Sequence, residues 1–199
     1  QQCTREACLE LKRKHLSLSF NHLSLFHMHC CALRDGLSVM ELDSIDGLPG
    51  EKKVMEDAKM GNDFATAENV RSCHNIARLI LSRKFDDPSI GSIVNQPLVK
   101  QKIQIRALNI FGIFLEGLLA YEMSRRAKGD ERVQWIAIGD LVLSKMKLWS
   151  EHCPWNFENK VLLLEAERTS ISEEFHQAEA FYIRSLKSAH EHKFIHEVS

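Results

Sequence analysis

The chain has 199 residues, of which 44% are hydrophobic and 27% are charged, and its formal net charge is −1 with the histidines neutral. This is a globular composition, with enough residues for one sizeable core or for a stack of several helix pairs. The balanced charge lacks the basic excess expected of a protein that binds nucleic acid or an anionic membrane surface. Only four prolines and nine glycines interrupt the sequence, which favours long helices over a many-turned β fold.

The longest apolar run, residues 107–121, contains Asn109 and Glu116 and is too short to span a bilayer comfortably. We therefore expect no membrane partner. The six cysteines form no regular framework and follow no secretory signal, which favours reduced thiols and a cytoplasmic location. The chain begins with Gln1, and residues 194–197 resemble the start of another helix, so we interpret the sequence as a piece of a longer polypeptide.

The first 61 residues form a predicted N-terminal helical region. Within residues 4–40, apolar side chains recur at steps of three and four residues, which is typical of one face of a helix: Leu9, Leu16, Phe20, Leu23, Phe26 and Cys30. Residues 43–50 contain Gly47, Pro49 and Gly50 and are expected to be a loop. Residues 51–60 are predicted to form a short polar helix.

Residues 62–199 are predicted to be a second region of stacked helices. The helix 65–85 is followed by a connector at 89–98 and by a very apolar helix at 99–127, in which Gly112 and Gly117 each cost about 1 kcal/mol relative to alanine. Close helix approach is the expected compensation. A helix at 131–153 ends before Pro154, and its predicted inner face consists of Trp135, Ile138, Leu141, Val142, Met146 and Trp149.

The last two helices, at 156–169 and 173–191, carry small residues where two helices would touch. Ala166 lies twelve positions before Ala178, and Tyr182 and Leu186 follow Ala178 on one helical face, with Phe175 just ahead of it. This is the spacing of a tetratricopeptide-type helix pair, which needs stacked neighbours to bury its apolar face. The sequence thus predicts an all-α fold, an α-solenoid of antiparallel helix pairs with about six to seven helices and no strand.

A longer resemblance follows from the run Trp-Ser-Glu-His-Cys-Pro-Trp-Asn-Phe-Glu-Asn-Lys at 149–160, from residues 162–167 and from residues 175–192, which lead into Lys193 and Phe194. These residues resemble the helical repeat region of very large signalling proteins, which join a kinase-like domain, a STAND-type AAA ATPase, the helical array and often a sensor histidine kinase. The Phe-Leu-Glu-Gly-Leu stretch at 114–118 resembles the first helix of the preceding pair. The similarity covers about half of the chain, residues 103–197.

The resemblance implies a non-catalytic linker and protein-interaction role. The chain has no Gly-x-x-x-x-Gly-Lys-Ser/Thr loop and no kinase catalytic-loop signature, so the ATPase and kinase activities do not carry over and no cofactor is expected. In the last pair, the first helix is expected to expose Lys160, Leu163, Glu167 and Ile171 on the concave face. A peptide or a neighbouring domain could bind there through Lys160 and Glu167. Alternatively these residues only meet solvent, and the module is a structural spacer.

A hypothesis of a different class uses the N-terminal part of the chain, which is rich in histidine and cysteine: His15, His22, His27, His29, Cys30 and Cys31. In this hypothesis the chain is a small helical metal-binding protein or an enzyme, and these side chains are its metal ligands or site residues. However, a step of seven residues separates side chains by about 10.5 Å along a helix, so His15, His22 and His29 cannot meet at one ion. Neighbours such as His152 and Cys153 point about 100° apart and do not form a nucleophile pair. We prefer polar surface roles for these residues and core packing for Trp135, Trp149 and Trp155.

Overall fold

The computed structural model describes residues 2–13, 24–25, 27–28, 31, 44–45, 48–61, 64–100 and 107–194. These residues are almost entirely helical, which confirms the all-α class, and they form eight α-helices against the six to seven predicted. A two-residue ladder, β1 (Ser44–Ile45) antiparallel to β2 (Leu48–Pro49), lies in the predicted loop and was not anticipated. The chain divides into two compact units, residues 1–87 with 102–112 and residues 88–101 with 113–199.

The first unit contains α1 (Gln2–Arg13), α3 (Glu51–Met60) and α4 (Phe64–Ser82). α3 packs on α4, and its buried face joins a core made of Leu25, Met28, Cys31, Val54, Ala58, Ala67 and Val70. Arg71 of α4 connects the two helices by pairing with Glu51 of α3 at 3.2 Å, and it also pairs with Glu68 on its own helix. The boundary predicted after residue 61 therefore falls inside this unit.

The helix predicted over residues 4–40 is described only in pieces. α1 ends at Arg13, and residues 24, 25, 27, 28 and 31 are helical. Of the predicted apolar stripe, Leu9 is half-buried against Cys8 and Leu48, while Leu16, Phe20, Leu23, Phe26 and Cys30 lie outside the described residues. The prediction of helix is confirmed for the described residues of this range and is not tested for the others.

The second unit begins with α5 (Ile90–Asn95) and a 3-10 turn, η2 (Leu98–Lys100), which replace the predicted connector. The next helix, α6, is described over Ala107–Arg126, and residues 101–106 before it lie outside the described residues. The side chain of Glu116 fixes the turn at residues 98–100, because its two carboxylate oxygens accept the backbone N–H groups of Leu98 and Val99 at 2.6 and 2.9 Å. Because a side chain accepts these N–H groups, residues 98–100 form a separate 3-10 turn.

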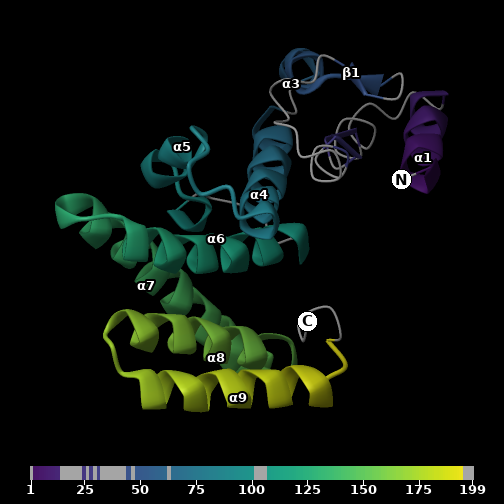
Figure 1. The fold of residues 1–199 in the computed structure, drawn as a ribbon. Helices are drawn as coiled ribbons and strands as arrows, with labels where there is room; N and C mark the ends of the chain where they lie inside the picture. The colour runs from purple at the N-terminus through teal and green to yellow at the C-terminus, as the bar shows by residue number, and fades with distance from the viewer. Residues whose placement is uncertain are drawn as a thin grey trace. The chain divides into compact units, whose positions relative to one another are not determined.

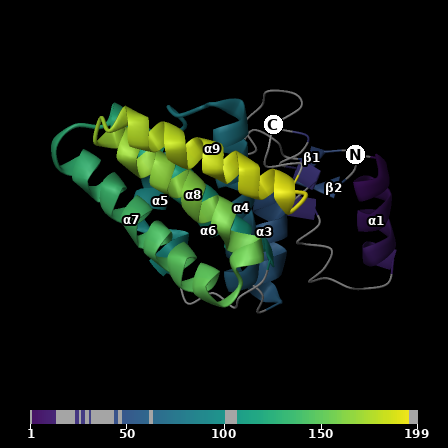
Figure 2. The same cartoon turned by 90° about the horizontal axis from the view of Figure 1, so that it is seen from below.

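Three long helices follow α6 in the second unit: α7 (Gly129–His152), α8 (Pro154–Ile171) and α9 (Phe175–Glu191). They run antiparallel one after another, with α8 packed between α7 and α9 (Figures 1 and 2). Pro154 is the first residue of α8, where its missing N–H costs nothing. Glu173 and Lys193, each two residues beyond the end of α8 and α9, have positive φ, and the N–H of the following residue bonds back to a carbonyl in the last turn of the helix.

Small residues lie where the helices of the second unit meet. A Cβ placed on Gly117 of α6 would lie 2.7 Å from Val142 of α7 and 2.9 Å from Leu164 of α8. Ala166 of α8 and Ala178 of α9 are 0% and 3% exposed, as the sequence predicted. The expected compensation for glycine in α6 is therefore present, because the missing side chain lets three helices approach closely.

Gly139 of α7 makes the closest of these approaches. Its hydrogen lies beside the ring of Tyr121, whose Cε1 atom would overlap with an added Cβ and whose Cδ1 and Cζ atoms would both lie 2.8 Å from it. The ring is fully buried, and its hydroxyl donates to Asp140 at 3.1 Å, so it has little freedom to move aside.

In the described part of the chain, no helix is both long and apolar enough to cross a bilayer.

We predict that Gly139→Ala lowers the free energy of unfolding by about 1 to 3 kcal/mol, because overpacking against a fixed ring outweighs the better helix propensity of alanine. Urea denaturation followed by circular dichroism measures the change. Gly91→Ala is the matched control, since a Cβ there meets nothing within 4 Å and the helix gains propensity. Equal stability of the two variants would contradict the role given to Gly139.

Candidate interaction surface

The four residues predicted to bind a partner all lie on α8, but the structure does not expose them as expected. Lys160 is only 7% exposed, and Leu163, Glu167 and Ile171 are half-buried. The predicted exposure is therefore wrong for Lys160. The reason is that α8 is the middle helix of its layer and packs on α7 and on α9 (Figure 2). Whether these residues bind a partner stays a prediction.

Lys160 is buried among aromatic rings. Its ammonium lies 4.7 Å from the ring centroid of Phe194 and 5.9 Å from that of Phe114, and Nζ donates to the carbonyl of Asn156 at 3.2 Å. Ring faces carry negative partial charge and attract a cation. Phe194 reaches this position because α9 ends in a tight turn, in which the Phe194 N–H bonds the Ala189 carbonyl. Lys160 thus holds the end of α9 against α6 and α8.

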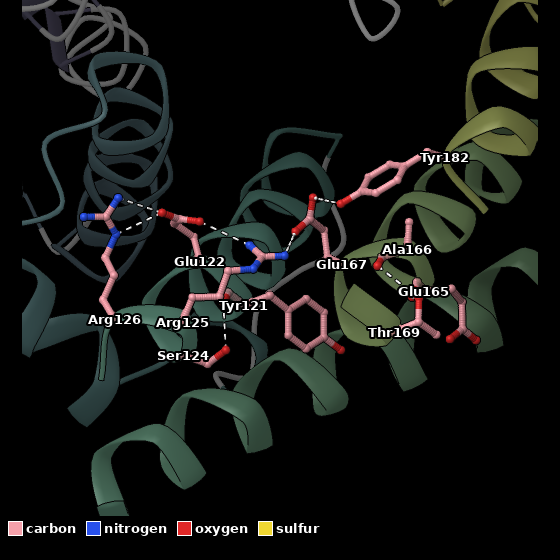
Figure 3. A network of polar contacts seen from close by, with 10 residues as sticks. All are labelled: Tyr121, Glu122, Ser124, Arg125, Arg126, Glu165, Ala166, Glu167, Thr169 and Tyr182. Carbon is pink, nitrogen blue, oxygen red and sulfur yellow. Dashed lines mark hydrogen bonds and ion pairs between the residues drawn. The ribbon is translucent and has the colours of Figure 1, made fainter. Parts of the chain in front are cut away.

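Glu167 is part of a polar network that joins three helices (Figure 3). Its carboxylate pairs with Arg125 of α6 and accepts the hydroxyl of Tyr182 of α9 at 2.8 Å. Arg125 also pairs with Glu122 at 3.1 Å, and Glu122 pairs with Arg126 at 2.8 Å. Arg125 and Arg126 are both exposed at the end of α6, and of the two Arg125 makes the ion pair that connects α6 to α8.

A second polar cluster lies in the same unit and connects α6, α7 and α8. Asp140 of α7 accepts both the hydroxyl of Tyr121 at 3.1 Å and the guanidinium of Arg168 at 2.7 Å. Burial raises the pKa of Tyr121, and the nearby Asp140 carboxylate raises it further. Burial and the bond to Glu167 likewise raise the pKa of Tyr182. Both phenols remain protonated donors, so these two clusters connect helices through hydrogen bonds.

α9 presents its large apolar side chains outward. Phe175, Ile183 and Leu186 are 66%, 59% and 49% exposed, and helical geometry places them within about 80° of one another. The face turned toward α8 is buried and carries small side chains, which are those of Ala178, Ser185, Ser188 and Ala189. An exposed apolar stripe of this kind is typical of an interaction site, whereas a single exposed leucine is not.

Four further aromatic and apolar predictions have different outcomes. Trp135 is fully buried, as expected, and Trp149 is half-buried against Phe157. Trp155 was expected in the core but is 60% exposed, with its ring 4.2 Å from that of His192. Leu141 was placed on the inner face of α7 but is 40% exposed, because Val142 and Ile138 fill that face.

Glu116 was not recognised in the sequence as more than a polar interruption of an apolar run. It is fully buried in α6, and burial raises the pKa of its carboxyl to about 7, although the bonded N–H groups of Val99 and Leu98 lower it. Lys145 of α7 donates to the carbonyl of Val99 at 3.2 Å and supports the same turn. Glu116 thereby fastens residues 98–100 to α6.

The histidine and cysteine residues of the rival hypothesis are only partly described. His27 and Cys31 are buried one helical turn apart, with Nε2 and Sγ separated by 3.5 Å. His15, His22, His29 and Cys30 lie outside the described residues. No group of three or more metal-ligating side chains occurs among the residues that are described. The metal-binding hypothesis therefore stays a prediction that this pair does not decide.

We predict that Lys160→Glu destabilises the protein by about 3 kcal/mol, because it buries a carboxylate against two ring faces and a carbonyl oxygen. Lys160→Met keeps the length of the side chain without the charge and is expected to change stability by less than about 1.5 kcal/mol. Thermal and urea unfolding of the three proteins measure this difference. A stable Lys160→Glu protein would show that the side chain turns to solvent.

The raised pKa of Glu116 predicts that stability depends on pH. Between about pH 4.5 and about pH 7 the folded protein holds a proton that the unfolded chain releases, so the free energy of unfolding falls as the pH rises through this range. Glu116→Gln removes this slope and also lowers stability, because its amide nitrogen then faces a backbone N–H. Urea unfolding at several pH values measures the slope, and Glu131→Gln on the exposed side of α7 is the control. A slope retained in Glu116→Gln would assign the pH dependence elsewhere.

Comparison of the chain with protein-family models, with curated proteins and with solved structures finds no match. The resemblance of residues 103–197 to the helical arrays of signalling proteins therefore remains an expectation from the sequence. Function has to be argued from the surfaces described above, because a fold by itself does not define a task.

Proposed function

We propose that this chain is a non-catalytic protein-interaction and linker module, built as an α-solenoid of stacked helix pairs and belonging to a larger cytoplasmic signalling protein. The observation that carries the proposal is the outward face of α9, defined as the exposed side that bears Phe175, Ile183 and Leu186. On an edge helix of a stack, such a face is where the next helix or a partner protein would pack.

The arrangement of α9 supports this interpretation through the size of its side chains. An amphipathic helix that only completes a core turns its large apolar residues inward. α9 does the reverse, because alanine, serine and the half-buried Tyr182 face α8 while Phe175, Ile183 and Leu186 meet solvent. Fully burying one large apolar side chain contributes about 1.5 to 3 kcal/mol, so a partner that covers three of them gains substantial affinity.

The proposal modifies the predicted site on α8. Glu167 is already bound by Arg125 and Tyr182, and Lys160 is buried beneath Phe194. Any partner contact at Leu163, Glu167 or Ile171 would be a peripheral one that leaves these bonds intact. The main contact is assigned to α9 and the linker role to the rest of the stack.

We expect the double change Ile183→Asp with Leu186→Asp to abolish binding to protein partners, because it places two charges in the apolar stripe without touching the buried side of α9. Affinity capture from native extract with the whole chain as bait, analysed by mass spectrometry, provides the readout. Arg184→Asp is the matched control, since it adds a carboxylate next to Ile183 but on an exposed position about 100° around the helix.

The wild type and the Arg184→Asp control should retain the same proteins, and the double variant should lose them while keeping the wild-type circular dichroism spectrum. Capture of the same proteins by all three would contradict an interaction role for the outward face of α9.

A further inference from the structure

The outward face of α9 carries charge as well as apolar surface. Glu179 and Lys187 are exposed and lie four residues before and four residues after Ile183, so each is about 6 Å from it along the helix axis. Lys187 approaches Glu191 at 3.9 Å with its side chain 75% exposed, and within the described part of the chain no ion pair engages Glu179. One negative and one positive charge therefore flank the apolar centre symmetrically.

We propose that the partner of this face is a second copy of the chain, docked with the two α9 helices antiparallel and the two-fold axis at Ile183. This inference rests on the proposed function, because it names the protein that binds the proposed interaction surface. In a two-fold contact the same patch is used by both copies, so the patch has to be complementary to itself.

The antiparallel arrangement satisfies that requirement. Each residue then faces the one that is equally far on the other side of Ile183 in the other copy. Glu179 meets Lys187 twice, and Leu186 lies over the small, exposed Ala180 twice. Further from the axis, His176 comes opposite His190 and Phe175 comes opposite Glu191, so the apolar centre of the contact consists of Ile183, Leu186 and Ala180.

The opposite orientation is disfavoured by the same charges. A parallel pair in register would set Glu179 against Glu179 and Lys187 against Lys187, and like charges directly opposite each other repel. The charge pattern thus selects the antiparallel pair, as flanking charges do in coiled coils.

The size of the contact sets its strength. α9 has 17 residues and is about 25 Å long, so one helix-to-helix contact buries less than the roughly 800 Å² per partner of a standard stable interface. We therefore expect a weak dimer that forms as the protein concentration rises and weakens with salt.

Charge exchange across the contact tests the proposal. Glu179→Lys alone and Lys187→Glu alone each convert both cross-copy pairs to repulsion, and each should weaken dimerisation about tenfold at low salt. An equimolar mixture of the two variants should restore it, because lysine at position 179 of one copy then faces glutamate at position 187 of the other. Sedimentation equilibrium of the whole chain gives the association constants, with Arg184→Asp as a control that should leave the dimer intact.

The proposal is overturned if the wild type stays monomeric up to its solubility limit, or if the mixture associates no more tightly than the single variants. These outcomes are distinct from failure of the proposed function. If the wild type is monomeric but Ile183→Asp with Leu186→Asp still abolishes capture of another protein, the interaction role stands and only self-docking is wrong.

Discussion

Close approach of helices at residues without side chains is the constraint on which the second unit depends. Gly117 of α6 and Gly139 of α7 leave no room for a Cβ, since Val142, Leu164 and the ring of Tyr121 already occupy that space. Ala166 and Ala178 continue the pattern into α8 and α9 with buried methyl groups. Helices at this spacing gain many dispersion contacts, which repay the propensity cost of glycine.

This mode of packing determines which residues remain for the surface. Because the contacts between α8 and α9 use small residues, the large apolar side chains of α9 are not needed in the core and lie outside. Hydrogen bonds and ion pairs between polar side chains also hold the helices together. Glu167 links α6 and α9 to α8, Lys160 holds the end of α9, and Glu116 fastens the turn that precedes α6. The proposed interaction surface is a consequence of how the interior is packed.

Local patterns in the sequence predicted the helices well and the side-chain environments less well. The period of apolar residues located α7, α8 and α9 to within a few residues, and the alanine spacing correctly predicted two buried residues. The prediction that Lys160 is exposed was wrong because the ring that covers it, Phe194, lies 34 positions later in the sequence. Phe194 reaches Lys160 through a turn at Lys193, where the sequence has no glycine to indicate a turn. Glu116 was missed for the same reason, since its partners are backbone N–H groups 17 and 18 residues earlier.

Native-state hydrogen exchange resolved by helix tests the central claim most directly. If neighbouring helices are held pairwise by close contacts at small residues, opening free energies should be highest for amides around Gly117 and Gly139 and should decrease through α8 to α9, which is held from one side. A single opening free energy shared by α6, α7, α8 and α9 would contradict this account and would indicate one indivisible core.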